Sequence, residues 1–180
     1  MLIYALTLAM GCGQTVPKDQ QVLVDLARQA VESEVRHLEP PRPKVHTGAK
    51  AVFVTIERNG KVIGCRGDLT SRTASVEDEV VLAARAAAAH DPRYGPLKLT
   101  DLQGFLVTVT VVSKLDPMSS VDGLLPSDGL VLQAGNKKGI VLPWEGKDPQ
   151  LRLKWAFKKA GVPENSAVTL FRLTASRCRG

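Results

Sequence analysis

Hydrophobic residues recur at helical spacing in three segments of the chain, 19–38, 75–90 and 148–160. In each segment, apolar positions three or four residues apart form one face, which predicts an amphipathic helix with a buried side. The second helix is expected to start at Ser75, because Asp78 three positions on completes a variant of the capping box. Prolines follow the first two segments and a glycine follows the third, which is the expected way for helices to end.

Short apolar runs elsewhere predict strands. The run 51–65 is rich in β-branched residues on both sides of Asn59-Gly60, the strongest short signal for a hairpin turn. The run 105–112 is almost unbroken, and its Thr108 and Thr110 predict that one face of the strand is less buried than the other. We further expect a loop at 117–129, a second hairpin with strands at 130–132 and 140–143, and a final strand at 168–174.

Helices interleave irregularly with hairpins in this order of elements. The order therefore predicts an α+β fold, with a mixed, largely antiparallel sheet and flanking helices. The chain has 180 residues, which suffice for one well-packed core but not for two large independent domains. Aromatic residues make up only 4% of the chain, so the core is expected to be aliphatic.

The chain is basic, with a formal net charge of +6 and much of the excess in its later part. Such a balance attracts anionic partners, among them phosphorylated metabolites, RNA and membrane surfaces. A solvated basic face is the alternative interpretation. Basic residues are not interleaved with aromatic ones in the way that stacks bases, which argues against a nucleic-acid partner.

Three cysteines occur, Cys12, Cys65 and Cys178, and they are too few and too widely spaced for a disulfide scaffold or a metal knuckle. The sequence contains no Cys-x-x-Cys and no pair of histidines at helical spacing. We therefore predict no metal site and no cofactor.

The chain opens with an apolar run, residues 1–9, followed by Met10-Gly11-Cys12. The run is shorter than the about 20 residues that span a bilayer, but its length suits a signal peptide. A small residue directly before Cys12 resembles the bacterial lipoprotein cleavage box, after which the cysteine would carry a lipid. Against this, no Lys or Arg precedes the run and Met10 is large for its place. A membrane-anchored lipoprotein and a cytoplasmic protein both stay open, with residues 1–18 as a leader and 19–180 as one domain.

The tetrapeptide Gly64-Cys65-Arg66-Gly67, at the end of the first hairpin, is the best candidate site. Its glycines, Gly64 and Gly67, let the backbone turn tightly or another group approach closely. Cys65 is a candidate nucleophile, with Arg66 lowering the pKa of the thiol or holding an anionic substrate. Such chemistry ordinarily uses an adjacent base, for which His90 is the candidate. Two alternatives stay open, namely a buried, inert thiol and a site that binds a ligand without catalysis.

Three further candidate binding residues, Asp91, Arg93 and Tyr94, follow the second predicted helix. If their loop folds over the cysteine, Asp91 or Arg93 would assist at the site. The alternative is a simple helix stop, in which Arg93 pairs with Asp91 and Tyr94 fills a gap.

Several motifs follow one another at a characteristic order and spacing between about residues 20 and 175. They are Phe53–Ile56, Asn59-Gly60, Gly64–Gly67, Asp91–Leu97, Val107–Val109, Gly129–Leu132, Lys138–Pro143 and Lys159–Gly161. Together they resemble the AMMECR domain family.

The resemblance implies an α+β fold with a larger and a smaller lobe and with the cysteine motif near the cleft between them. It implies no settled activity. As partners it implies a Memo-like protein and a radical S-adenosylmethionine protein, beside which prokaryotic relatives are often encoded. The chain departs from the family pattern at Val62-Ile63, where Leu-Arg is usual, and at Asp128, where a His is common. A mechanism that requires this arginine or histidine is therefore not expected here, although Arg66 could replace the missing charge.

From the sequence we expect a protein that binds a ligand, such as an anionic small molecule, or a partner protein within the pathway of its relatives. A thiol-dependent enzyme with Cys65 as nucleophile is the first alternative. A basic nucleic-acid-binding protein is the second. A membrane role is expected only through a lipid on Cys12.

Overall fold

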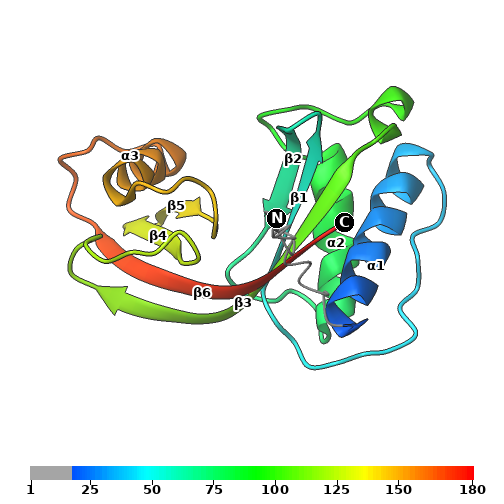
Figure 1. Cartoon of the computed structure of the whole chain (residues 1–180), viewed down its shortest axis with the longest axis horizontal. Coiled ribbons are helices and arrows are strands. Elements are labelled where there is room, and N and C mark those ends of the chain that lie inside the picture. The colour runs from blue at the N-terminus through cyan, green and yellow to red at the C-terminus, as the bar shows by residue number, and fades with distance from the viewer. Residues whose placement is uncertain (1–17) are drawn as a thin grey trace, which may run out of the picture.

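Six strands form one sheet in the computed structural model, which describes residues 18–180, and three helices flank it (Figure 1). The order of the strands across the sheet is β2-β1-β3-β6-β4-β5, and every pairing is antiparallel. The predicted α+β class is thus confirmed. The strands are β1 Val52–Arg58, β2 Lys61–Gly67, β3 Leu106–Met118, β4 Gly129–Ala134, β5 Lys137–Val141 and β6 Thr169–Arg179.

The helices lie close to where the hydrophobic pattern predicts them. They are α1 Lys18–Val35, α2 Val76–Ala89 and α3 Pro149–Ala160, with a short 3-10 helix, η1, at Leu99–Leu102. Ser75 accepts a hydrogen bond from the backbone N–H of Asp78, which confirms the predicted start of α2. Asp148 caps α3 in the same way, and Gly161 ends it in the left-handed conformation. Among residues 18–180, no helix is both long and apolar enough to cross a membrane.

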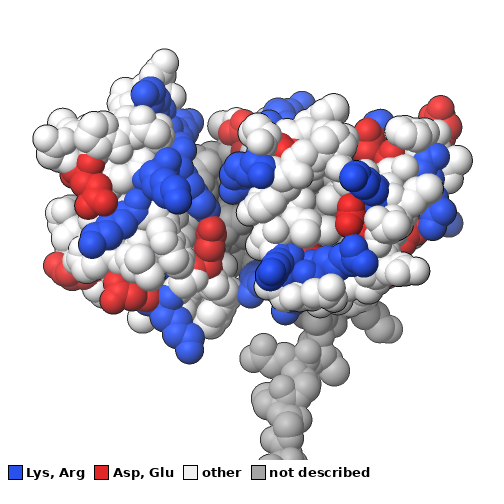
Figure 2. All heavy atoms as spheres, turned by 90° about the horizontal axis from the view of Figure 1, so that it is seen from above, with Lys and Arg blue, Asp and Glu red and all other residues white. Residues whose placement is uncertain are grey.

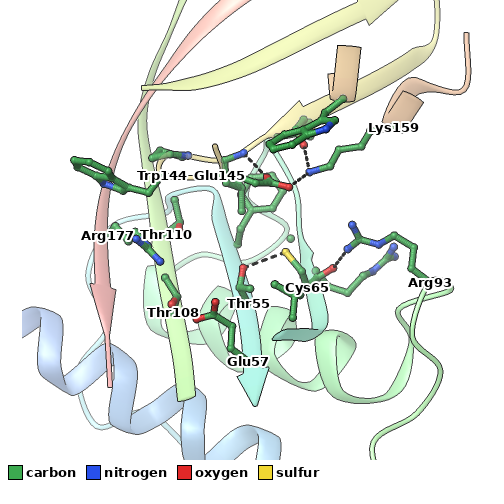
Figure 3. A pocket seen from close by; sticks show the side chains of 18 of the residues that line it. Thr55, Glu57, Cys65, Arg93, Thr108, Thr110, Trp144, Glu145, Lys159 and Arg177 are labelled. Carbon is green, nitrogen blue, oxygen red and sulfur yellow. Dashed lines mark hydrogen bonds and ion pairs between the residues drawn. The ribbon is translucent and has the colours of Figure 1, made fainter. Parts of the chain in front are cut away.

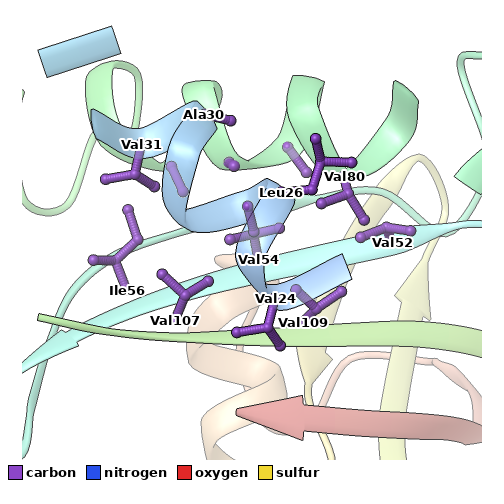
Figure 4. Close-up of a cluster of buried hydrophobic side chains, with 14 of the residues drawn as sticks. Val24, Leu26, Ala30, Val31, Val52, Val54, Ile56, Val80, Val107 and Val109 are labelled. Carbon is purple, nitrogen blue, oxygen red and sulfur yellow. The ribbon is translucent and has the colours of Figure 1, made fainter. Parts of the chain in front are cut away.

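The larger lobe is built from α1, α2 and the β2-β1-β3 part of the sheet. Side chains alternate along β1 and β3, so that their valines and Ile56 point toward the two helices (Figure 4). Four alanines give α2 a thin apolar face, which lets its backbone approach β2 closely. A Cβ atom on Gly64 would lie 2.3 Å from the backbone oxygen of Ala87. Gly64 is therefore required for packing between β2 and α2.

The smaller lobe has its own apolar cluster between α3, β4 and β5, with Leu130, Leu132 and Phe157 among its members. Gly139 makes a close contact like that of Gly64, since an added Cβ would lie 1.8 Å from the backbone oxygen of Ala156. Arg152 is completely buried in this lobe, and its guanidinium donates hydrogen bonds to backbone oxygens of the 124–129 segment. The two lobes expected from the family resemblance thus each have a core.

Two long strands, β3 and β6, pair with each other and run from one lobe to the other (Figure 1). The prediction that the strand ends at 112 and a loop holds Pro117 was wrong, because β3 continues to Met118 with Pro117 paired to Phe171. Beyond Val111 the neighbour β1 has ended, so β3 is there an edge strand in which a proline is tolerated. In this β3–β6 ribbon, the part of β3 beyond Val112 is largely exposed, which explains why its residues lack a strand-like hydrophobic pattern.

The face of the sheet opposite to the helices carries Thr55, Thr108 and Thr110, because they alternate with the core valines of β1 and β3. Thr108 and Thr110 are themselves buried, but their face of β3 also carries Leu106, which is 40% exposed, whereas Val107 and Val109 on the other face are completely buried. The predicted difference between the two faces is therefore present. It marks the side of the sheet that forms the floor of a cavity.

Candidate ligand-binding cavity between the lobes

A cavity of about 880 Å³ lies between the two lobes. Its floor is the polar face of β1, β3 and β6, and one wall is β2 with the segment that follows α2. The opposite wall comes from the smaller lobe, through β5, the 142–146 loop and α3. Figure 2 shows basic side chains on both sides of the hollow that separates the lobes.

Strand pairing places Cys65 next to the polar floor. Thr55 of β1 is the cross-strand partner of Cys65 on one side and of Thr108 on the other. The hydroxyl of Thr55 donates a hydrogen bond to the sulfur of Cys65 at 3.2 Å (Figure 3). The half-buried thiol thus belongs to a row of short polar side chains that crosses three strands.

The thiol of Cys65 is not activated in this arrangement. Burial raises the pKa of Cys65 above its ordinary value, and the hydrogen bond from Thr55 and the charge of Arg93 only partly offset this. The prediction that Arg66 lowers this pKa was wrong, since the cations that lower it are Arg93 and Lys159. Arg66 is exposed and lines the cavity. Most of the thiol is protonated at neutral pH as a result.

Asp91 and Arg93 hold the backbone of Cys65. The buried carboxylate of Asp91 accepts a hydrogen bond from the N–H of Cys65 at 2.8 Å, and the guanidinium of Arg93 donates to the Cys65 carbonyl at 3.0 Å. Arg93 also forms an ion pair with Asp91 at 2.8 Å. Burial alone would raise the pKa of Asp91, but the hydrogen bonds from Arg93 and Cys65 outweigh it and lower the pKa. The loop therefore folds against the cysteine, and the Asp91–Arg93 pair positions it.

The other predicted site residues lie in different places. Tyr94 is 46% exposed and lines the cavity, so it does not fill a gap as the helix-stop alternative had it, although the Arg93–Asp91 pair of that alternative is present. Gly67 also lines the cavity, whereas Gly64 faces α2. His90 ends α2 and is absent from the cavity lining. Cys12 lies outside the described residues, as do residues 1–17 of the leader.

The smaller lobe contributes a second charged pair, opposite the cysteine. Lys159 of α3 forms an ion pair with Glu145 at 2.5 Å and donates to the carbonyl of Ile140 at 2.9 Å. The second carboxylate oxygen of Glu145 accepts the backbone N–H of Leu142, which fixes the 142–146 loop to β5 and α3. Both charges act on the pKa of Cys65, so the two lobes face each other across the cavity.

Cationic side chains outnumber carboxylates around the cavity. Glu57 and Glu145 are the acidic residues of its lining. The basic residues of the lining are Arg66, Arg93, Lys138, Lys158, Lys159 and Arg177. This excess makes the interior favourable for an anion.

Sequence reasoning missed much of this lining. Thr55, Glu57 and Arg177 were hidden because strand pairing, which brings them together, cannot be deduced from the chain order alone. Trp144 and Trp155 also line the cavity, and the sequence holds only these two tryptophans. A tryptophan between Pro143 and Glu145, in an otherwise aromatic-poor chain, was a signal that could have identified the loop. No group of three or more potential metal ligands occurs within residues 18–180.

Fold and site together define the class of this molecule as a two-lobed α+β protein with a cysteine in the wall of a basic interlobe cavity. The AMMECR1 family model matches residues 24–178, and the chain belongs to this family. The resemblance that the sequence motifs predicted is thereby confirmed.

Similar proteins occur in archaea and bacteria. A protein of Aeropyrum pernix is 37% identical over 164 residues, which cover 81% of this chain and 70% of the relative. A protein of Thermofilum pendens is 31% identical and covers 86% of this chain and 84% of its own length. The crystal structure of an uncharacterised protein from Pyrococcus horikoshii superimposes with a TM-score of 0.78 at 25% identity, covering 91% of this chain and 93% of that one.

Proposed function

We propose that this AMMECR1-family protein binds an anionic small molecule in the cavity between its lobes. The observation that carries the proposal is the excess of cationic over acidic side chains in the cavity lining. The volume of about 880 Å³ falls in the range of pockets that enclose a metabolite-sized ligand.

Several of these cations have no protein charge to neutralise them. Arg93 is paired with Asp91 and Lys159 with Glu145. By contrast, no ion pair with a residue of the described chain involves Arg66, Lys138, Lys158 or Arg177. Like charges that converge on one space repel one another, and an anion in the cavity would relieve this repulsion.

The unpaired cations come from both lobes. Arg66 and Arg177 belong to β2 and β6 beside the larger lobe, whereas Lys138 and Lys158 belong to β5 and α3 of the smaller lobe. A ligand with negative charge would therefore contact both lobes at once. Because the β3–β6 ribbon crosses between them, such a ligand would also stabilise one relative orientation of the lobes.

Binding without catalysis accounts better for the cysteine than nucleophilic catalysis does. A nucleophilic cysteine needs a substantial thiolate fraction and ordinarily a nearby base. Burial raises the pKa of Cys65, and none of the histidines of the described chain lines the cavity. A thiol-dependent reaction remains the second candidate function, because the sulfur does border the cavity and a bound anion or substrate would change its surroundings.

Calorimetric titration with pyrophosphate at low ionic strength tests the proposal. Lys158→Ala and Arg177→Ala remove unpaired cations from the α3 wall and from the floor of the cavity, and each should weaken binding about fivefold or more. Lys154→Ala is the matched control, since Lys154 is exposed on the same helix as Lys158 but lies outside the cavity lining. Equal affinities for the wild type and the cavity variants would contradict the proposal.

The same titration separates the remaining alternative partners. Binding of RNA that is insensitive to Lys158→Ala and Arg177→Ala would favour a nucleic-acid role for the outer basic surface instead. We also propose, from the family resemblance, that the protein acts with a Memo-like protein and a radical S-adenosylmethionine protein. Co-purification of the tagged chain with either protein from a common host would support this, and its absence under mild conditions would count against it.

A further inference from the structure

The end of the cavity away from Cys65 contains polar and aromatic groups that the proposed anion binding leaves unexplained. Figure 3 shows Thr108, Thr110, Arg177 and Trp144 toward one end of the cavity, with Cys65 and Arg93 toward the other. The residues come from β3, β6 and the 142–146 loop, so both lobes contribute to this end.

The hydroxyl of Thr108 is buried and has no hydrogen-bond partner among the described residues. Buried hydroxyls are almost always hydrogen-bonded, because leaving one unpaired costs its lost hydration. Thr110 stands two residues along the same face of β3 and is the cross-strand partner of Arg177. A ligand atom that reached the floor would find two hydroxyls and a guanidinium close to one another.

Arg177 is available to such a ligand because the nearby carboxylate of Glu57 already forms an ion pair with Arg179. Glu57 lies 2.8 Å from the guanidinium of Arg179, so its charge is already balanced, although the angle between the two groups does not make a good hydrogen bond. Partial loss of solvent around the guanidinium lowers the pKa of Arg177, and Glu57 only partly compensates, although the residue as a whole is exposed. An anionic ligand group would add charge-assisted hydrogen bonds to this guanidinium.

Trp144 lies beside this floor in an unfavourable backbone conformation. Its backbone adopts a φ of 65°, which L-residues rarely adopt, and its side chain is 57% exposed. The backbone N–H of Trp144 donates a hydrogen bond to the carbonyl of Pro126 at 2.6 Å. Gly146 packs so closely on Trp155 that an added Cβ would lie 2.5 Å from its ring. The loop thus presents an exposed indole from a fixed backbone, an arrangement suited to packing on a flat ring.

From these observations we infer that the ligand is an aromatic anion, whose charged group binds Arg177, Thr108 and Thr110 and whose ring packs on Trp144. This inference rests on the proposed function, because it names the chemical class of the anion that the cavity binds. It also assigns the two ends of the cavity, with the anion and ring at the Trp144 end and the remainder of the ligand directed toward Cys65.

Three probes separate the two features of the ligand. Inorganic phosphate supplies the anion alone, 1-naphthol supplies the ring alone, and 1-naphthyl phosphate supplies both. Calorimetric titration of the full chain should show that 1-naphthyl phosphate binds about fivefold or more tightly than phosphate. The neutral 1-naphthol should bind more weakly than 1-naphthyl phosphate, because it leaves Arg177 unpaired.

Variants then test which residues bind the ring of the ligand and which bind its anionic group. Trp144→Ala should abolish the advantage of 1-naphthyl phosphate over phosphate, while Trp144→Phe should retain most of it. Thr108→Val keeps the shape of the side chain and should weaken both anionic probes about fivefold. Leu151→Ala removes an exposed apolar side chain from α3 outside the cavity lining, so this control should leave the advantage unchanged. Circular dichroism of each variant verifies that it is folded.

The outcomes distinguish this inference from the proposed function. If phosphate binds but 1-naphthyl phosphate binds no tighter, or if Trp144→Ala and Thr108→Val change nothing, the aromatic anion is wrong and anion binding stands. If neither phosphate nor 1-naphthyl phosphate binds at low ionic strength, the proposed function itself fails.

Discussion

The carboxylate of Asp91 accepts a hydrogen bond from the backbone N–H of Cys65 at 2.8 Å. The two residues are far apart in the chain, since Cys65 is near the end of β2 and Asp91 directly follows α2. Arg93 completes the connection by bonding both to the Asp91 carboxylate and to the Cys65 carbonyl. The position of the thiol in the cavity wall therefore depends on a residue whose side chain does not line the cavity.

Replacing Asp91 by asparagine should destabilise the protein in a pH-dependent way. The lowered pKa of Asp91 means that its contribution is present above the ordinary value of 3.8 and is lost as pH falls through the lower folded value. Asp91→Asn should therefore reduce the free energy of unfolding by about 1–3 kcal/mol at pH 7. The difference from the wild type should shrink below about pH 4.

Urea unfolding at pH 7 and pH 3 measures this difference. Glu164→Gln is the control, because Glu164 is exposed and no hydrogen bond or ion pair with the described residues involves its side chain. A stability gap between Asp91→Asn and wild type that is as large at pH 3 as at pH 7 would show that the carboxylate charge is not the cause.

The Cys65 thiol should react slowly with alkylating reagents at neutral pH. Burial raises its pKa above the ordinary value of 9.0, so the thiolate that attacks iodoacetamide forms only in alkaline solution. The alkylation rate, followed by mass spectrometry of the Cys65 peptide, should still be rising at pH 9. Thr55→Val removes the hydrogen bond that lowers this pKa, and the profile should shift further to high pH. A rate that levels off below neutral pH would instead support a nucleophilic cysteine.

The sequence identified the tetrapeptide at Cys65 as a candidate site, but it did not show which structural role each of its residues has. Glycines beside a thiol are compatible with a ligand approaching the backbone, and also with close packing inside the protein. The structure separates the two, because Gly64 faces α2 whereas Gly67 and Cys65 border the cavity. The distinction depends on which strand and helix meet, and local sequence patterns do not contain this information.

Gly64→Ala should therefore destabilise the larger lobe. Its Cβ would lie 2.3 Å from the backbone oxygen of Ala87, and a backbone atom cannot move aside as a flexible side chain can. We expect a loss of about 3 kcal/mol in the free energy of unfolding. Gly48→Ala is the control, since nothing lies within 4 Å of the added atom. Thermal unfolding should show a lower midpoint for Gly64→Ala and little change for Gly48→Ala, and equal midpoints would refute the packing role.

Most elements of the fold could be predicted because they bury one regular face. The helices and the Asn59-Gly60 hairpin show this clearly, since Asn59 and Gly60 both adopt the positive φ that such a turn requires. Only parts of β3 and β6 were predicted, at 105–112 and 168–174, and their continuations were missed because these stretches are largely exposed and bury no regular face. The cavity floor could be predicted only in part. Thr108 and Thr110 were recognised as a distinct face, but the smaller lobe that covers them lies far along the chain.

The loop before α2 is held by hydrogen bonds to one fully buried acid, Glu79. Glu79 accepts hydrogen bonds from the side chain and backbone N–H of Arg72 and from the backbone N–H of Thr73. Glu79→Ala would leave these part-buried donors without their protein partner, and the Arg72 side chain is 39% exposed. We expect a loss of about 3 kcal/mol in the free energy of unfolding.

Arg72→Ala should reduce the free energy of unfolding by a similar amount or less. The double variant should lose less than the sum of the two single losses, because the two side chains contact each other. Urea unfolding of the four proteins measures this coupling. Additive losses would mean that Glu79 stabilises the loop without help from Arg72.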